Sequence, residues 1–391
     1  MVLSERRPKK PLRVFYMVYS LTSGGIEKYS VNLLKHIDKQ KFSLDFITKI
    51  DRKEFFDDQV SSLGGKKIPL SSENSSGVRE MFELFWNAYK TARRGYDLAY
   101  FNLSTPAAVF KYPLICKLAG IHKIVIHSHN ASEDGAGIGH SVVNYLGRAV
   151  INRISSERFA CSDKAAQWLF GGKVAEQGQY TLIQNGIETV KYTYNKEKRE
   201  KIRKELNIGR DHLVLGHVGR FAEQKNHEFL IAIMKEISKI DTKAVLLLIG
   251  VGEKFGSIQS LVHEYGLNDR VKFMGETDRV ADLMQAMDVF VLPSHFEGLP
   301  VVGIEAQASG LKCVLSSNIS LEADVTGNVS FLDLNLGPKK WANFIDEVRG
   351  YQRQDTSKAI CDAQYDIRET TRLVEKKLTE VSRFEVELES A

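Results

Sequence analysis

The feature that most constrains the fold is an alternation of short apolar segments with helical segments, repeated along the chain in two series. Strands joined in this way through helices run parallel and are connected by right-handed crossovers. The first series therefore predicts a doubly wound α/β domain. Its expected strands are 12–19, 42–48, 66–70, 97–101, 124–127, 158–161 and 180–183.

A second series of the same kind begins at about residue 213. The polar stretch before it, 188–210, is predicted to be a linker followed by a solvated helix. A chain of 391 residues exceeds what one core usually organises, so two domains are expected, over 1–187 and 188–364. A C-terminal helix over about 365–391 is expected to pack back on the first. Ligands bind at the carboxyl ends of such sheets, which predicts a cleft between the two domains.

Composition narrows the class of protein. The net charge of +5 is too mild for a nucleic-acid binder. The four cysteines are widely spaced, which favours a reducing compartment over a disulfide framework or a zinc site. The N-terminus lacks the apolar segment of a signal peptide, and no apolar run approaches the ~20 residues that span a bilayer. We therefore expect a cytoplasmic protein that could meet only the surface of the membrane, at its inner face.

The most informative motif follows the expected strand 289–292 and contains two acids, Glu297 and Glu305, eight positions apart. Pro300 stands where a helix would begin, and Gly298 allows a ligand to approach the backbone closely. The amides and dipole of such a helix start favour an anion. Glu305 would lie between one and two turns into the helix, where a carboxylate can accept two ribose hydroxyls.

Arg220 and Lys225 lie in the loop after the first strand of the second series, close behind Gly219. Two cations there suit a diphosphate, because the guanidinium binds as a fork and the ammonium as a compact charge. In the first domain, Gly24 and Gly25 form a turn that could approach a phosphate, although neither a dinucleotide fingerprint nor a P-loop is present. His129 lies at the end of the expected strand 124–127, and no third metal ligand accompanies His127 and His129.

Together these motifs resemble those of the family 4 retaining glycosyltransferases, which have two Rossmann-like domains facing each other across a cleft (GT-B). The resemblance covers about residues 12–335 and lies in Ser-x-x-Glu-Gly-x-Pro-x-x-x-x-Glu, Gly-Arg-x-x-x-x-Lys and Gly-Gly-x-Glu. It implies catalytic roles for His129, Arg220, Lys225 and Glu297. It implies donor binding by Gly24, Gly25, Gly219, Gly252, Glu276, Gly298, Leu299, Pro300, Val301 and Glu305. It puts Glu27 and Asn130 on the acceptor side.

The mechanism expected from these residues needs no metal or cofactor. No Asp-x-Asp occurs in the sequence, so the two cations and the helix start would stabilise the departing diphosphate. Double displacement needs two carboxylates at the anomeric carbon, and only Glu297 is a candidate, which the resemblance assigns to sugar hydroxyls. Front-face substitution with retention is therefore favoured.

The expected activity is transfer of a hexose or N-acetylhexosamine from a nucleotide sugar, such as a UDP-sugar, to a glycan or polyprenyl-diphosphate-linked oligosaccharide. The motif forms are similar to those of bacterial capsular or exopolysaccharide transferases. Two alternatives stay open: a nucleotide-sugar 2-epimerase and a non-catalytic nucleotide-sugar-binding protein. A third, a nicotinamide-dependent oxidoreductase, is disfavoured by the absent dinucleotide fingerprint.

Two further stretches bear on the acceptor. Residues 78–94, which are aromatic with cations at the end, and residues 140–158, with Arg148 and Arg153, are both expected to be helices. Basic amphipathic helices can dock on anionic membranes, but packing on the sheet with a solvated cationic face is the favoured interpretation of each. The stretch 130–140 contains three glycines and is predicted to be a mobile loop over the acceptor side. The sequence does not identify the sugar, the linkage or the acceptor.

Overall fold

The structure is a computed structural model that describes residues 10–129 and 138–383, with the side chains of 138–141 left aside. The chain divides into two compact units. Unit 1 contains the chain up to Gly186 together with Ile367 onward, and unit 2 contains Ile187–Asp366. The sequence-based boundaries, 187/188 and 364/365, thus lie within two residues of the observed ones.

Unit 1 is built on a seven-stranded sheet in the order β3-β2-β1-β4-β5-β6-β7, and every strand pair in it is parallel. Successive side chains of β1 enter different cores: Phe15 and Met17 one, Val14 and Tyr16 the other. Burial on both faces explains why the strands are continuous apolar runs. The strands are β1 (Leu12–Met17), β2 (Phe42–Asp51), β3 (Lys66–Ser72), β4 (Leu98–Leu103), β5 (Ile124–Ser128), β6 (Glu157–Ala160) and β7 (Thr181–Leu182).

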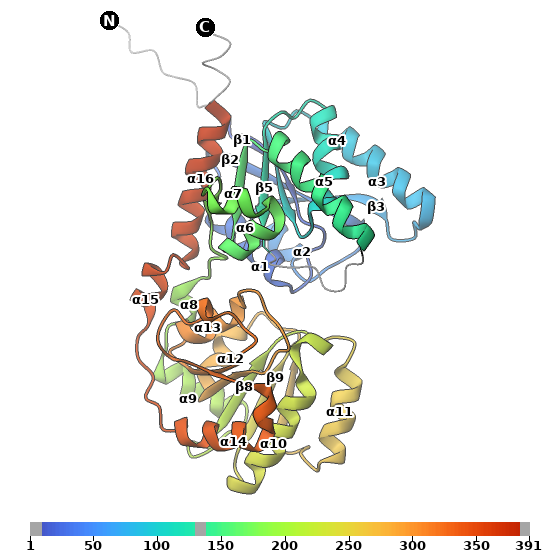
Figure 1. Ribbon diagram of the computed structural model, residues 1–391. Helices are drawn as coiled ribbons and strands as arrows, with labels where there is room; N and C mark the ends of the chain where they lie inside the picture. The colour runs from blue at the N-terminus through green and yellow to red at the C-terminus, as the bar shows by residue number, and fades with distance from the viewer. Residues whose placement is uncertain (1–9, 130–137, 384–391) are drawn as a thin grey trace, which may run out of the picture. The chain divides into compact units, whose positions relative to one another are not determined.

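Helices cover both faces of this sheet (Figure 1). One face carries α1 (Gly25–His36), α2 (Asp57–Ser62) and α16 (Ile367–Arg383), and Val374 and Leu378 of α16 share a core with α1. The C-terminal helix therefore belongs to the N-terminal domain. The opposite face carries α3 (Gly77–Ala92), η1 (Pro106–Phe110), α4 (Tyr112–Leu118), α5 (Ile138–Ile154), α6 (Asp163–Phe170) and α7 (Gly172–Glu176).

Unit 2 repeats the plan with a six-stranded parallel sheet in the order β10-β9-β8-β11-β12-β13. Its strands are β8 (Val214–Val218), β9 (Val245–Ile249), β10 (Val271–Gly275), β11 (Val289–Leu292), β12 (Lys312–Ser316) and β13 (Val329–Leu332). The predicted fold class, two parallel-sheet α/β domains, is confirmed.

The helices of unit 2 also form two layers. One layer contains α8 (Thr189–Tyr192), α9 (Lys196–Glu205), α12 (Val280–Ala286), α13 (Val301–Ala308) and α15 (Ser357–Asp362). The other contains α10 (His227–Ile240), α11 (Phe255–Glu264) and α14 (Gly337–Val348).

The sequence-based interpretation of 188–210 as linker and solvated helix needs correction. Ile202 and Arg203 of α9 are buried, and both Arg199 and Arg203 pair with Asp288 at the start of β11. The charged composition predicted a solvent-exposed helix, but two of its arginines form ion pairs with Asp288 inside unit 2.

The strand order reverses once in each sheet, between β1 and β4 in unit 1 and between β8 and β11 in unit 2. Open parallel sheets bind ligands at the carboxyl ends of the strands beside such a switch point. The sequence motifs occupy the loops after three of these four strands, with Gly24 after β1, Gly219 after β8 and Glu297 after β11. Over the described ranges, no helix is both long enough and apolar enough to cross a bilayer.

Candidate active site

Glu297 is held by three side chains of unit 2. Its Oε1 accepts from Lys225 Nζ at 2.5 Å and from Ser294 Oγ at 2.9 Å, while its Oε2 is 3.4 Å from Gln224 Nε2. The carboxylate and ammonium side chains are only 9% and 16% exposed. A carboxylate has about four acceptor positions, so Oε2 retains capacity for a ligand hydroxyl.

The loop that carries Glu297 is tied to its neighbours through backbone groups. His295 N donates to Gln224 O at 2.9 Å, and Asn318 Nδ2 donates to His295 O at 3.0 Å. Glu297 also forms an isolated parallel bridge with Ile319. The loops after β8, β11 and β12 are therefore joined, which gives the carboxylate a defined position.

Arg220, the second predicted cation, is exposed, and no ion pair of its guanidinium is found within the described parts of the chain. Its loop packs tightly against the loop after β9. A Cβ on Gly250 (φ +134°) would come within 2.1 Å of Gly219 O, and one on Gly252 within 2.5 Å of Phe221 O. Gly252 is thus required by loop packing, a reason that the motif did not reveal.

Pro300 is the N-cap of α13, one position before the first helical residue Val301. The prediction of a first-turn proline was off by one residue, and at either place the missing N–H is harmless. Gly303 N donates to Pro300 O at 2.8 Å, and the amides at the very start of α13 have no acceptor within the helix. Leu299 is partly buried against the core beneath.

Glu305 lies in the second turn of α13 and is 3% exposed. Burial is the main reason why the pKa of Tyr192 is raised well above its usual value, and the adjacent Glu305 carboxylate raises it further. Tyr192 belongs to α8, so the segment after the domain boundary contributes to the surroundings of Glu305.

Two other predicted donor residues are exposed. Gly298 follows Glu297 directly, and Glu276 follows β10 after Gly275, which has φ +66°. The described structure gives neither residue a contact that tests its predicted role.

In unit 1, Gly24 is the N-cap of α1 and Gly25 its first residue. The side chain of Glu27 folds back over this turn. Its Oε2 lies so close to Gly24 that a Cβ there would be only 2.2 Å away. Its Oε1 accepts from Ser20 Oγ at 2.9 Å. Desolvation raises the pKa of Glu27, and hydrogen bonds from its own amide and Ser20 oppose that rise. A side-chain carboxylate thus already lies at the helix start that the glycines would offer to an anion.

His129 is held between two asparagines, with Nε2 2.8 Å from Asn102 Oδ1 and Nδ1 2.8 Å from Asn185 Oδ1. Burial lowers its pKa to about 4, so the ring is neutral and can donate through one nitrogen only. Asn102 Nδ2 already donates to Met17 O at 3.0 Å, so its oxygen must accept from His129 Nε2–H. Asn185 must then turn its amide nitrogen toward Nδ1.

His127 packs against His129 with ring centroids 3.9 Å apart and is fully buried. Its Nδ1 is 2.7 Å from Tyr100 Oη, and burial lowers its pKa well below the usual value. The two histidines are thus part of one buried polar group. Asn130 and the rest of the predicted loop up to 137 lie outside the described residues.

Sequence reasoning did not assign four residues that position the site. Ser294 and Gln224 stood inside the quoted motifs without a role, and Asn102 was not noticed. Asn185 had no predicted role either. The signal for Asn102 was a polar residue near the end of a buried strand beside a switch point.

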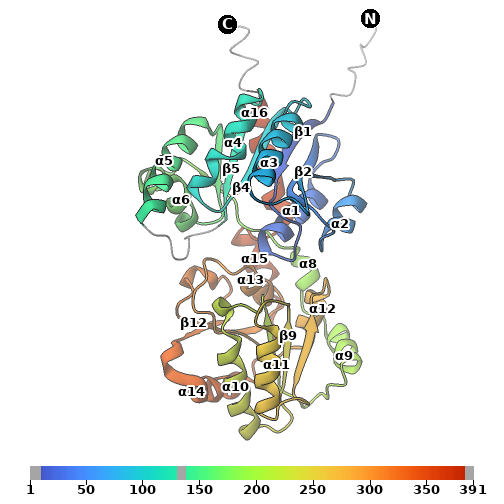
Figure 2. The same cartoon turned by 90° about the vertical axis from the view of Figure 1, so that its right-hand side faces the viewer.

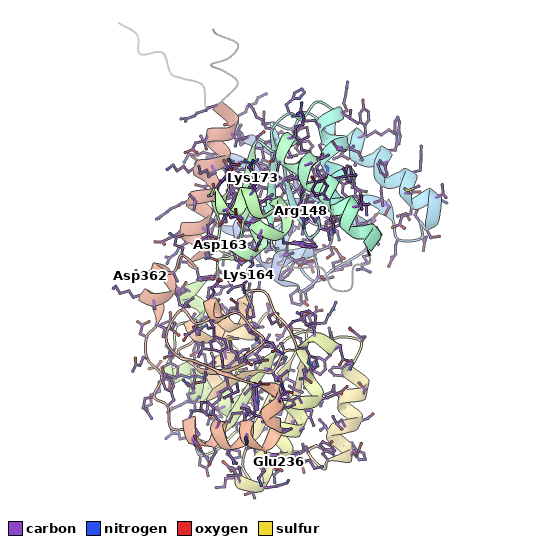
Figure 3. The ribbon with its side chains drawn as sticks, viewed as in Figure 1. Arg148, Asp163, Lys164, Lys173, Glu236 and Asp362 are labelled. Carbon is purple, nitrogen blue, oxygen red and sulfur yellow. The ribbon has the colours of Figure 1, made fainter. Side chains whose placement is uncertain are left out.

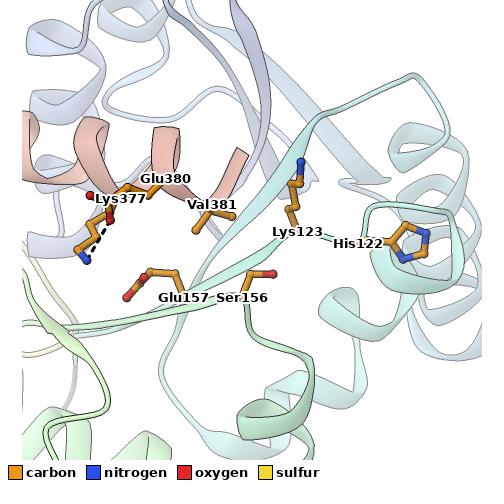
Figure 4. A pocket seen from close by; sticks show the side chains of 7 residues that line it. All are labelled: His122, Lys123, Ser156, Glu157, Lys377, Glu380 and Val381. Carbon is orange, nitrogen blue, oxygen red and sulfur yellow. Dashed lines mark ion pairs between the residues drawn. The ribbon is translucent and has the colours of Figure 1, made fainter. Parts of the chain in front are cut away.

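A pocket of about 380 Å³ lies elsewhere in unit 1, beside α16 (Figure 4). Its lining mixes charges, with Glu157, Lys377 and Glu380 around Lys123, whose Nζ donates to Ser382 O at 2.8 Å. None of the predicted site residues lines it. The described parts of the chain also hold no group of three or more His, Cys, Asp or Glu arranged for a metal ion.

Known proteins are similar to this chain in both sequence and fold. Residues 198–337 match the family "Glycosyl transferases group 1". A putative glycosyltransferase EpsF of Bacillus subtilis is 32% identical over 335 residues, which cover 85% of this chain and 86% of EpsF. An Escherichia coli UDP-Gal:alpha-D-GlcNAc-diphosphoundecaprenol alpha-1,3-galactosyltransferase is 24% identical over 255 residues, covering 64% of this chain and 65% of the relative.

Among solved structures, Anabaena Alr3699/HepE in complex with UDP and glucose superposes with a TM-score of 0.74 at 20% identity. The alignment covers 94% of this chain and 99% of HepE, which supports the GT-B fold. The EpsF match extends across both units at an identity that indicates common descent. The chain is therefore a glycosyltransferase and belongs to the group 1 family.

Proposed function

We propose that the chain is a retaining glycosyltransferase that moves a hexose or N-acetylhexosamine from a UDP-sugar to a glycan or lipid-linked glycan. The donor is supported by the UDP and glucose bound to HepE and by the UDP-Gal named for the E. coli relative. The acceptor is supported by the diphosphoundecaprenol in the same relative's name. Capsular or exopolysaccharide synthesis is the process that we propose for it.

The observation that carries this proposal is the contrast between Glu297 and Arg220. Glu297 is anchored by Lys225, Ser294 and Gln224 with one oxygen left to accept a hydroxyl. Arg220, in the same group of joined loops, is exposed and free of ion pairs over the described residues. The anchored carboxylate of Glu297 suits a sugar hydroxyl, and the unpaired guanidinium of Arg220 suits a phosphate. A nucleotide sugar contains both groups.

In the proposed mechanism these groups act by positioning and charge. Glu297 orients the sugar through its hydroxyls, and Arg220 and the first amides of α13 receive the charge of the departing diphosphate. Lys225 shares its charge between Glu297 and the diphosphate. Glu305 holds the ribose, and the leaving phosphate oxygen takes the proton of the acceptor hydroxyl. Transfer on the donor's own face retains the anomeric configuration.

The test measures acceptor-dependent release of UDP with a panel of UDP-sugars, after a thermal-shift screen selects the donors that bind. NMR of the product gives the anomeric configuration, and an assay in EDTA addresses the proposed independence from metal. We expect release of UDP only with acceptor, product of the donor's configuration and an unchanged rate in EDTA.

Other outcomes select other functions. Free epimerised sugar without an acceptor would identify a 2-epimerase, and binding without turnover would identify a nucleotide-sugar-binding protein. Product of inverted configuration would contradict the proposed front-face reaction while leaving the family intact.

A further inference from the structure

One face of unit 1 exposes a concentration of large hydrophobic side chains. Of the seventeen exposed large hydrophobics among the described residues, eleven lie on α3, η1, α4 and α5, and these are all that unit 1 has. We call this set the apolar face. It consists of Val78, Met81, Phe82, Phe85, Trp86, Phe110, Leu118, Val142, Val143, Tyr145 and Leu146.

The apolar face is the outer side of one helical layer. Figure 2 shows α3, α4 and α5 toward the viewer, with α16 behind the sheet. On α3 the exposed residues recur at helical spacing from Val78 to Trp86, while Ala88 and Ala92 face the core. The helix thus has a second apolar side that its own domain leaves uncovered.

A groove of about 250 Å³ runs between α3 and α4, and its lining is almost wholly apolar. Phe82, Trp86 and Tyr89 line it together with Leu118, and the three rings follow one another at centroid distances of 6.4 and 6.2 Å. Phe82 is 66% exposed and Leu118 is 78% exposed. An exposed apolar patch of this extent marks an interaction surface.

The charges around the apolar face are cationic. The chain contains no Asp or Glu over residues 98–132 or 135–156, so η1, α4 and α5 carry no carboxylate. The two acids of α3 are neutralised, Glu80 by Lys49 at 2.8 Å and Glu83 by Arg79 at 2.9 Å.

The cations, by contrast, flank the hydrophobic residues. Lys90 Nζ lies 5.2 Å from the centroid of the Trp86 ring, Lys111 directly precedes α4, and Lys117 precedes the exposed Leu118. The exposed Arg153 lies in the last turn of α5, whereas Arg148, labelled in Figure 3, donates to Trp168 O at 2.9 Å and lies over the Trp168 ring.

We propose that the apolar face docks on an anionic lipid bilayer, with its aromatic and aliphatic side chains among the headgroups and its lysines against lipid phosphates. This inference rests on the proposed function, because a lipid-linked acceptor would be reached from the membrane surface. Apolar residues rimmed by cations match such a surface, since η1, α4 and α5 carry no carboxylate and the two on α3 are ion-paired. Trp and Tyr favour the interface itself.

The experiment is co-sedimentation of the full chain with phosphatidylglycerol–phosphatidylcholine vesicles and with phosphatidylcholine vesicles, at low and high salt. We expect binding to the anionic vesicles that weakens with salt. Phe82→Ser with Leu118→Ser should reduce partitioning by about tenfold or more. Lys111→Gln with Lys117→Gln should reduce it by about thirtyfold, since each lysine near an anionic surface contributes about 1 kcal/mol.

Matched controls are Leu321→Ser and Val190→Ser in unit 2, which are 73% and 71% exposed and should bind as the parent does. Thermal unfolding checks that the variants stay folded. Absence of binding to anionic vesicles at low salt would overturn the proposal, as would undiminished binding of the Phe82/Leu118 variant. A dimer in vesicle-free sedimentation that this variant abolishes would instead identify an interface between copies, and would equally overturn it.

The two proposals fail separately. Transfer to a water-soluble acceptor without vesicles tests the glycosyltransferase reaction, and the Phe82/Leu118 variant should retain it. Loss of docking with transfer intact would leave the reaction standing and locate the defect in membrane contact.

Discussion

Two cations of one loop have different surroundings at the scale of single residues. Lys225 is 16% exposed and pairs with Glu297, whereas Arg220 is exposed and has no ion pair within the described residues. Arg220→Ala should therefore lower kcat/KM, with a loss of about 2–4 kcal/mol of transition-state stabilisation, and leave the melting temperature unchanged. Steady-state kinetics and thermal unfolding measure the two effects.

Lys225→Ala should lower kcat/KM similarly and also destabilise unit 2, because it leaves the enclosed Glu297 carboxylate without its counter-charge. Lys243→Ala is the control, since its ion pair with Asp211 lies on exposed side chains and should affect neither quantity. Equal kinetics for Arg220→Ala and the parent would refute the leaving-group role.

His129 yields a second prediction at this scale. Its ring should be the neutral Nε2–H tautomer at neutral pH, because Asn102 accepts from Nε2 and burial holds the pKa at about 4. Long-range ¹⁵N–¹H NMR correlations measure the tautomer directly. Asn102→Asp should raise this pKa, since a carboxylate would then face Nε2. An Nδ1–H tautomer in the parent would contradict the assigned hydrogen bonds.

At the scale of elements, the C-terminal end of α12 gathers three arginines around Asp288. Arg199 and Arg203 bond its carboxylate at 2.5 and 2.6 Å, and Arg353 donates to Met284 O at 2.9 Å. Carbonyl groups at the C-terminus of a helix attract cations. The end of α12 and the Asp288 carboxylate therefore balance the positive charge of the three arginines together.

Asp288→Asn should therefore destabilise unit 2 by about 3 kcal/mol, because it leaves two enclosed guanidinium groups without a counter-charge. Hydrogen exchange of unit 2 peptides measures the change. Asp282→Asn on α12 is the matched control: its side chain is 37% exposed, and its pairs should contribute less than about 1 kcal/mol. Similar losses for the two variants would show that the arginine cluster is not specific.

On the scale of the whole molecule, each unit encloses a pair of neighbouring histidines. Desolvation lowers the pKa of His129 and His217 to about 4 and that of His227 to about 2, and it lowers that of His127 as well. The unfolded chain binds these protons near pH 6.5, whereas the folded chain does not.

The free energy of unfolding should therefore be highest above about pH 6.5 and fall as the pH is lowered toward 4. Each such histidine contributes a slope of up to about 1.4 kcal/mol per pH unit. Urea unfolding between about pH 7 and pH 5 measures the slope. His217→Asn, which can keep the bond to Val291 O, should reduce it by one histidine's share. An unchanged slope in that variant would contradict the assignment.

Much of the architecture was predictable because the pattern is local. Strand 289–292 has its predicted bounds, and the strands predicted at 42–48, 97–101 and 124–127 begin within one residue of their expected starts, since runs of apolar residues mark them. The fold class and the family were predictable for the same reason: strand–helix alternation and the motifs around Glu297 and Arg220 are contiguous in sequence. The loop positions of the site residues followed from the strands before them.

What the tertiary structure alone decided are relations between distant residues. Lys225 and Glu297 are 72 positions apart and His129 and Asn185 are 56 apart, so no local pattern could reveal these pairs. The packing of Gly252 on Phe221, the burial of Arg203 in a helix of charged composition and the uncovered side of α3 are of the same kind. The sequence by itself determined the two parallel sheets and the chemistry of their loops, because periodicity and motif are written along the chain. Burial and charge neutralisation depend on which segments meet after folding, and only the folded chain decides that.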